Sequence, residues 1–211
     1  YTKDRILFLL KYGICYKTTT NKDGITQIEK HIMRYPQMFA TMAIRDKLRE
    51  GVRKGVIWHT QGSGKTALAY SNVRYLTDYF SREEGKIAKF YFIVDRLDLA
   101  EQAKGEFEAR GLNVKMIKDK KQFIDDIVNP GESNTSGKTT MTVLNIQKFS
   151  KESVTKPADY NVNVQRIYFL DEAHRSYNPT GSFLANLMSS DRNAVMIALT
   201  GTPLIGEGYN T

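Results

Sequence analysis

Residues 54–66 read Lys-Gly-Val-Ile-Trp-His-Thr-Gln-Gly-Ser-Gly-Lys-Thr, and this stretch decides the fold. A short apolar run leads into a loop with two glycines, and a segment with helical spacing of apolar residues follows Lys65-Thr66. Glycine allows the backbone to turn tightly, so that successive N–H groups can point at one anion. A strand, a glycine loop and a helix N-terminus in this order predict a phosphate-binding loop.

The residues of this loop have expected roles. Lys65 would reach the β- and γ-phosphates of a bound nucleotide, and the Thr66 hydroxyl would bind Mg²⁺. The backbone that would surround the phosphates belongs to Gln61, Gly62, Ser63 and Gly64. The usual pattern is G-x-x-x-x-G-K-[ST], and His59 stands at its first glycine position. A glycine-rich turn before an ordinary helix is therefore the alternative interpretation.

The composition is that of a globular protein that could bind a polyanion. The chain has 211 residues, enough for one core, and its 31 Lys and Arg against 23 Asp and Glu give a formal net charge of +8. This excess suits a nucleic acid partner, although many basic proteins bind none. Cys15 is the only cysteine, so we expect a reducing, cytoplasmic setting. No apolar segment approaches the roughly 20 residues of a membrane helix.

Apolar runs alternate with helical patterns along most of the chain. Strands are expected at 56–58, 88–94, 114–117, 141–144, 167–170 and 195–199, and helices at 35–50, after 66, and at 97–110, 120–128 and 182–190. This alternation predicts an α/β fold, a three-layer sandwich with a mostly parallel central sheet. Residues 2–12 predict a short helix, and a hairpin is expected around Asn21-Lys22-Asp23-Gly24. Residues 129–139 and 151–164 are expected to be polar loops.

Two further polar segments directly follow predicted strands. Asp171-Glu172 suit phosphoryl transfer, because the first acid can hold Mg²⁺ and the second can orient and deprotonate a water molecule. Acidic residues in the first turn of a helix are the alternative. Thr200-Gly201-Thr202-Pro203 could link the nucleotide site to a second surface, or form an ordinary turn. Ligands bind at the carboxyl ends of parallel strands, where all three polar segments are expected.

In this order, the three segments resemble motifs I, II and III of superfamily 2 helicases and translocases, and Asp171-Glu172-Ala173-His174 is a DEAH box. The amino-acid sequence is more similar still to that of the motor subunit, or restriction subunit, of type I restriction–modification enzymes. Four stretches carry this resemblance: residues 34–40, 56–65, 92–99 and 145–149. In that family a histidine at the position of His59 is ordinary. The resemblance spans residues 30–205.

The resemblance implies a RecA-like P-loop NTPase lobe that uses ATP and Mg²⁺. Gln37 matches a glutamine that reads the adenine edge, and a solvated helix glutamine is the alternative. The positions that would couple the nucleotide site to a second surface are His174, Thr200, Gly201 and Thr202. Those that match DNA-facing motifs are Arg96, Gln147 and Lys148. Arg96 could instead pair with Asp95 or Asp98.

The resemblance also implies a larger machine. The longer protein that contains this chain would hydrolyse ATP to translocate double-stranded DNA. It would cleave DNA with a nuclease domain outside this chain. Residues 1–33 would connect that domain to the first RecA-like lobe, residues 34–211. A second RecA-like lobe and the specificity and methyltransferase subunits are the implied partners. The alternatives are the first lobe of another superfamily 2 helicase or remodeller, and a scaffold lobe that binds DNA without turnover.

Overall fold

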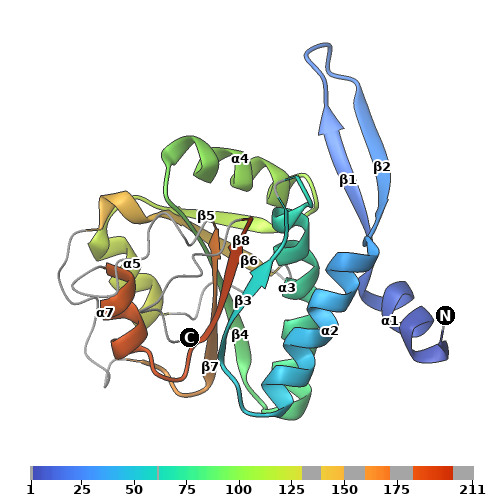
Figure 1. Ribbon diagram of the computed structural model, residues 1–211. Helices are drawn as coiled ribbons and strands as arrows, with labels where there is room; N and C mark the ends of the chain where they lie inside the picture. The colour runs from blue at the N-terminus through green and yellow to red at the C-terminus, as the bar shows by residue number, and fades with distance from the viewer. Residues whose placement is uncertain (1, 61, 130–138, 150–159, 172–182, 202–211) are drawn as a thin grey trace.

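A parallel six-stranded sheet forms the centre of the fold (Figure 1). The structure, a computed structural model, describes residues 2–60, 62–129, 139–149, 160–171 and 183–201. The strand order is β3 (Lys54–Trp58), β8 (Val195–Thr200), β7 (Val164–Asp171), β4 (Ile87–Val94), β6 (Thr140–Asn145) and β5 (Asn113–Ile117). Every neighbouring pair in this sheet is parallel, which confirms the predicted α/β fold with a parallel central sheet.

Helices cover both faces of the sheet (Figure 1). One face packs against α3 (Lys65–Glu83) and α4 (Leu97–Glu108), with α2 (Tyr35–Arg49) and α1 (Lys3–Tyr12) against α3. The other face packs against α5 (Lys120–Val128) and α7 (Phe183–Ser190). In β4, Phe90 and Phe92 belong to the first core and Tyr91 and Ile93 to the second. Side chains alternate across a strand, so this central strand is buried on both faces, as the middle layer of a sandwich must be.

Most predicted elements are present, with ends shifted by a few residues. The largest shift is in β7, which begins at Val164 and not at residue 167. The strand was predicted to start later because Gln165 and Arg166 are polar, yet both side chains are buried in the structure. Arg166 can lie inside because its guanidinium pairs with Asp191. The short 3-10 helix at Ile146–Lys148 was not predicted. Most of the two predicted polar loops, residues 130–138 and 150–159, lies outside the described residues.

The predicted hairpin projects away from the lobe (Figure 1). It consists of β1 (Ile14–Thr20) and β2 (Thr26–Ile32), which pair antiparallel. The middle of β1 is joined to the end of α4 by a hydrogen bond from the Thr18 amide to the Ala109 carbonyl (2.7 Å) and by an ion pair between Lys17 and Glu106 (2.9 Å). Cys15 lies near the start of β1, where it is partly buried and packs against the first core.

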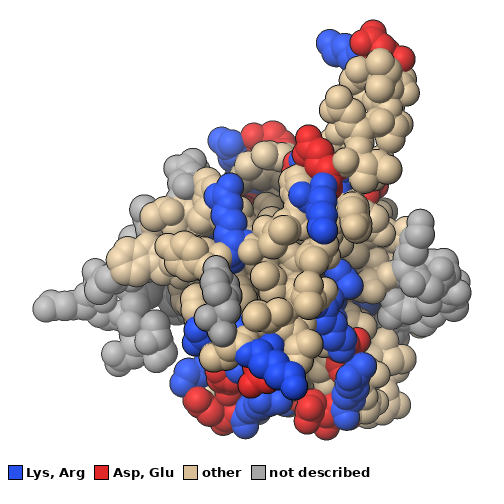
Figure 2. Space-filling view, turned by 90° about the vertical axis from the view of Figure 1, so that its right-hand side faces the viewer, with Lys and Arg blue, Asp and Glu red and all other residues tan. Residues whose placement is uncertain are grey.

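Figure 2 shows the side of the molecule that carries α1, α2 and the hairpin. Basic side chains there are interspersed with acidic ones and form no surface of a single sign. Basic side chains elsewhere in the described structure also pair with acids, as Lys47 does with Glu50 and Arg53 with Glu84. The excess of positive charge therefore does not by itself mark this face as a nucleic acid surface. None of the helices in the described residues combines the length and the apolar character that crossing a membrane requires.

Candidate nucleotide-binding site

The predicted phosphate loop lies between β3 and the first turn of α3. Gly62 and Gly64 have φ angles of +77° and +84°, which residues with a Cβ rarely adopt. The Leu68 amide donates to the Gly64 carbonyl (2.9 Å) and so starts the helix. Lys65 and Thr66 therefore occupy the first turn of α3, where helical N–H groups have no partner inside the helix. Gln61 lies outside the described residues.

Two buried polar atoms at this loop have no hydrogen-bond partner within the described part of the chain: Ser63 Oγ and His59 Nδ1. Burial, and then the positive charge of Lys65, lower the pKa of His59, so its imidazole is neutral at pH 7. Burying a polar atom without a partner costs free energy, and a bound ligand or ion is one way to offset that cost. The Ser63 hydroxyl can donate to a phosphate oxygen. The loop is therefore chemically suited to a phosphate group.

The carboxyl ends of three neighbouring strands bring the predicted motifs together. β8 lies between β3 and β7, and the strand register pairs Trp58 with Thr200 and Leu199 with Asp171. The phosphate loop, Asp171 and the Thr200–Gly201 turn thus lie at one edge of the sheet. Glu172, His174 and Thr202 lie outside the described residues, so their roles stay predictions.

Two hydrogen bonds join the phosphate-loop strand to the Thr200–Gly201 turn, and sequence reasoning missed both. The His59 amide donates to the Thr200 carbonyl (3.0 Å), and the Trp58 indole Nε1 donates to the Gly201 carbonyl (3.0 Å). Trp58 is 63% exposed, so this hydrogen bond forms at the protein surface. Trp58 and Gly201 are 143 positions apart in the sequence, and no local sequence pattern indicates such a pair.

Gln37 lies against the phosphate loop and is 5% exposed, so it is not the solvated helix glutamine considered as an alternative. Its Oε1 accepts from the Arg34 amide (2.9 Å). Its Nε2 donates to the carbonyls of Ser63 (3.3 Å) and Gly64 (3.1 Å). The expected contact with adenine stays a prediction, but the structure brings the side chain to the nucleotide site.

The predicted DNA-facing residues follow β4 and β6, which are neighbours in the sheet. Arg96 is exposed and forms an ion pair with Asp98 (2.9 Å), one of the two carboxylates proposed as an alternative partner. Gln147 is exposed on the short 3-10 helix. The side chain of Lys148 is outside the described set. Arg96 and Gln147 therefore lie at the same sheet edge as the phosphate loop.

The residues also fit the expected Mg²⁺ ion. Among the described residues, no group of three His, Cys, Asp or Glu side chains could hold a metal. A Mg²⁺ ion that accompanies a nucleotide needs only one or two protein oxygens, since phosphates and water supply the rest. The Thr66 hydroxyl and the Asp171 carboxylate are oxygen ligands of the kind that Mg²⁺ prefers.

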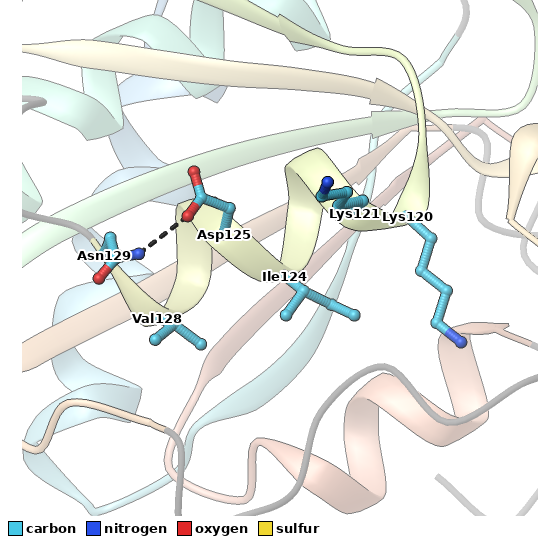
Figure 3. Close-up of a pocket in the computed structure, with 6 residues that line it drawn as sticks. All are labelled: Lys120, Lys121, Ile124, Asp125, Val128 and Asn129. Atoms are coloured by element: carbon cyan, nitrogen blue, oxygen red, sulfur yellow. Dashed lines mark hydrogen bonds between the residues drawn. The ribbon is translucent and has the colours of Figure 1, made fainter.

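A separate hollow of about 520 Å³ lies on the outer surface of α5 (Figure 3). It is lined by Lys120, Lys121, Ile124, Asp125, Val128 and Asn129. At one end Asn129 Nδ2 donates to Asp125 Oδ1 (2.8 Å). Its lining includes none of the predicted nucleotide-site residues, so it is a surface feature distinct from the phosphate loop.

Comparison with known proteins places the chain among ATPases. A family model described as SWI2/SNF2 ATPase matches residues 36–211. The type I restriction enzyme SsaAORF53P endonuclease subunit of Staphylococcus saprophyticus is 30% identical, over 84% of this chain and 18% of that protein. The putative type I restriction enzyme MjaVIIIP endonuclease subunit of Methanocaldococcus jannaschii is 26% identical, over 99% of this chain and 21% of that protein.

A solved structure shares the fold. It is a nuclease-deletion mutant of the Type ISP restriction-modification enzyme LlaGI in complex with a DNA substrate mimic, with a TM-score of 0.57 and 17% identity over 82% of this chain and 18% of that one. The chain thus spans about a fifth of the length of these proteins (18% to 21%). Since the family model covers the phosphate loop, Asp171 and Thr200, the chain belongs to the SWI2/SNF2 ATPase family, and it resembles the endonuclease subunits of type I restriction enzymes.

Proposed function

We propose that this chain is the ATP-binding lobe of a restriction enzyme motor that hydrolyses ATP to translocate double-stranded DNA. The observation that carries the proposal is the meeting of the phosphate loop, Asp171 and the Thr200–Gly201 turn at the ends of three neighbouring strands. Membership of an ATPase family supports ATP as the substrate. Arg96 and Gln147 are exposed at the same carboxyl-terminal edge of the sheet, which supports a DNA-binding surface beside the nucleotide.

The chemistry follows from the residue types. The Lys65 ammonium group and the loop N–H groups would hold the phosphates, with the Ser63 hydroxyl as a further donor. The Thr66 hydroxyl and the Asp171 carboxylate would hold Mg²⁺, which neutralises charge on the phosphates. Glu172 would orient the attacking water and accept its proton, because a carboxylate next to the phosphate can serve as a general base.

The rest of the machine belongs to the same proposal. A nuclease domain before residues 1–33 would cut DNA, and a second RecA-like lobe would complete the ATP site. The specificity and methyltransferase subunits would select the DNA site. The names of the relatives support this assignment, since they are endonuclease subunits of type I restriction enzymes. A cytoplasmic setting, expected from the single cysteine, is part of it.

The test is a calorimetric titration of the chain with ATP and Mg²⁺. We expect Lys65→Ala to raise the Kd for ATP by about a hundredfold, because charge-assisted hydrogen bonds to the phosphates are lost. Lys54→Ala is the matched control, since Lys54 is an exposed lysine at the opposite end of β3. Equal affinity in wild type and Lys65→Ala would remove the phosphate-loop assignment and favour the scaffold alternative.

Hydrolysis measured with and without duplex DNA tests the motor assignment. We expect the chain alone to turn over ATP very slowly, because an arginine finger from a second lobe contributes a factor of about 10³ to 10⁵ in rate. Turnover by this chain at the rate of a complete motor would contradict the division of the ATP site between two lobes. Strand separation by the whole protein would favour the helicase alternative.

A further inference from the structure

The Gln37 side chain joins the start of α2 to the phosphate loop. The Gln37 Nε2 amide group donates to the carbonyls of both Ser63 (3.3 Å) and Gly64 (3.1 Å). Its oxygen accepts from the Arg34 amide and so caps the first turn of α2. The side chain is 5% exposed. These contacts fix the amide in one orientation against the loop backbone.

This orientation determines where the loop N–H groups point. In a trans peptide the C=O and N–H bonds point in opposite directions. An amide that holds the Ser63 and Gly64 carbonyls on one side therefore turns the Gly64 and Lys65 N–H groups to the other side. These two N–H groups belong to the segment that would surround a phosphate. The Gly64 carbonyl also accepts from the Leu68 amide (2.9 Å), so one oxygen links the loop, α2 and α3.

Gly64 shows how close this contact is. A Cβ at position 64 would lie 2.6 Å from Gln37 Nε2, and the φ angle of +84° disfavours any side chain there. Glycine at this position thus satisfies two requirements, a left-handed backbone and the close approach of the glutamine amide.

We propose that Gln37 is a positioning residue that orients the phosphate loop independently of any base it contacts. The proposal rests on the function proposed above and adds a role that does not involve the adenine edge. A base read by this amide needs at least one free N–H donor. Since the Nε2 group contacts the loop carbonyls, loop positioning is the role that the contacts among the described residues support.

Ligands with and without a base separate these roles. Calorimetric titrations of the full chain with ATP and with inorganic tripolyphosphate, each with Mg²⁺, are compared for wild type and Gln37→Met. Methionine has a similar length and no donor. We expect both Kd values to rise by about fivefold to tenfold, the effect of losing one or two ordinary hydrogen bonds. The ratio of the two Kd values should stay within about twofold of the wild type.

Thr41→Val is the matched control for damage to α2. The Thr41 hydroxyl is buried one turn further along the helix, donates to the Gln37 carbonyl (2.9 Å) and accepts from Asn72 (3.1 Å). Its loss should lower the free energy of unfolding but leave both Kd values within about twofold of the wild type, since none of its hydrogen bonds reaches the loop. Amide hydrogen exchange at Leu68, whose N–H donates to the Gly64 carbonyl, should be faster in Gln37→Met and unchanged in Thr41→Val when measured without ligand.

Other outcomes would overturn the proposal. A weaker Kd for ATP with an unchanged Kd for tripolyphosphate would make Gln37 a base-reading residue only. Unchanged exchange at Leu68 in Gln37→Met would show that the amide does not hold the loop. If wild type bound neither ligand, or if Lys65→Ala bound both as wild type does, the proposed function itself would fail, and this role with it.

Discussion

Two of the regions that hold buried polar groups can be compared by the partners of those groups. On the α5 side of the sheet, Asp126 is 2% exposed and pairs with Lys89 (3.0 Å) and Lys115 (2.7 Å). Nearby, the Asp191 carboxylate accepts hydrogen bonds from the Arg166 guanidinium and the Tyr168 hydroxyl. These charges are costly to bury, and their partners offset that cost.

At the phosphate loop, the buried Ser63 Oγ and His59 Nδ1 lack such partners within the described part of the chain. Removing a paired buried charge should therefore have a different consequence from changing a site whose polar atoms lack partners. Paired charges fasten helices to the sheet, so their loss should reduce stability. Polar atoms without partners are available to a ligand, so changes around them should reduce binding. The following predictions test this difference.

Asp126→Ala should have the largest effect on stability. It leaves Lys89, which is 3% exposed, without its carboxylate, and we expect the free energy of unfolding to fall by about 3–5 kcal/mol. Denaturant titration measures this change. Asp125→Ala is the control, because the neighbouring Asp125 is exposed and should matter by less than about 1 kcal/mol. Equal losses in the two variants would contradict a structural role for the Asp126 pairs.

The same carboxylate should make stability depend on acid pH. Burial alone would raise the pKa of Asp126, but the hydrogen bond from Lys115 and the charge of Lys89 outweigh it and lower the pKa. A carboxylate with a lowered pKa stabilises the fold above its unfolded pKa of about 3.9, and this contribution is lost as the pH falls through the folded pKa. Between pH 7 and 3, unfolding free energy should therefore fall more steeply in wild type than in Asp126→Asn. Parallel pH profiles for the two proteins would show that the pairs with Asp126 contribute no stability.

Arg96→Ala should have the smallest effect on the free energy of unfolding and a measurable effect on the salt dependence of DNA affinity. Its ion pair with Asp98 lies at the surface, with half or more of each side chain exposed, so we expect a stability change below about 1 kcal/mol. If Arg96 contacts a DNA phosphate, the slope of log affinity against log salt should decrease by about 1. Fluorescence anisotropy with duplex DNA measures this slope. Asp98→Ala, which removes the same ion pair but keeps the arginine, should leave the slope as it is.

Much of the fold could be predicted because its signals are local. A near-continuous apolar run located β4 almost to the residue. In contrast, the predicted start of β7 was three residues too late because Gln165 and Arg166 are polar. Their burial depends on groups far along the chain, namely Asp191 for Arg166 and the Asn193 carbonyl for Gln165. A pattern read along one strand contains no information on such partners.

By itself, the sequence located a glycine loop between a strand and a helix and predicted that it binds phosphate, because the glycines and the following Lys65-Thr66 act on their own neighbours. It also determined that each polar segment ends a strand. Only the tertiary structure decided that β8 lies between β3 and β7, that Trp58 reaches Gly201, and that Gln37 holds the loop carbonyls. The physical reason is that these contacts depend on strand order and on the approach of α2 to the loop, which join residues 26 to 143 positions apart.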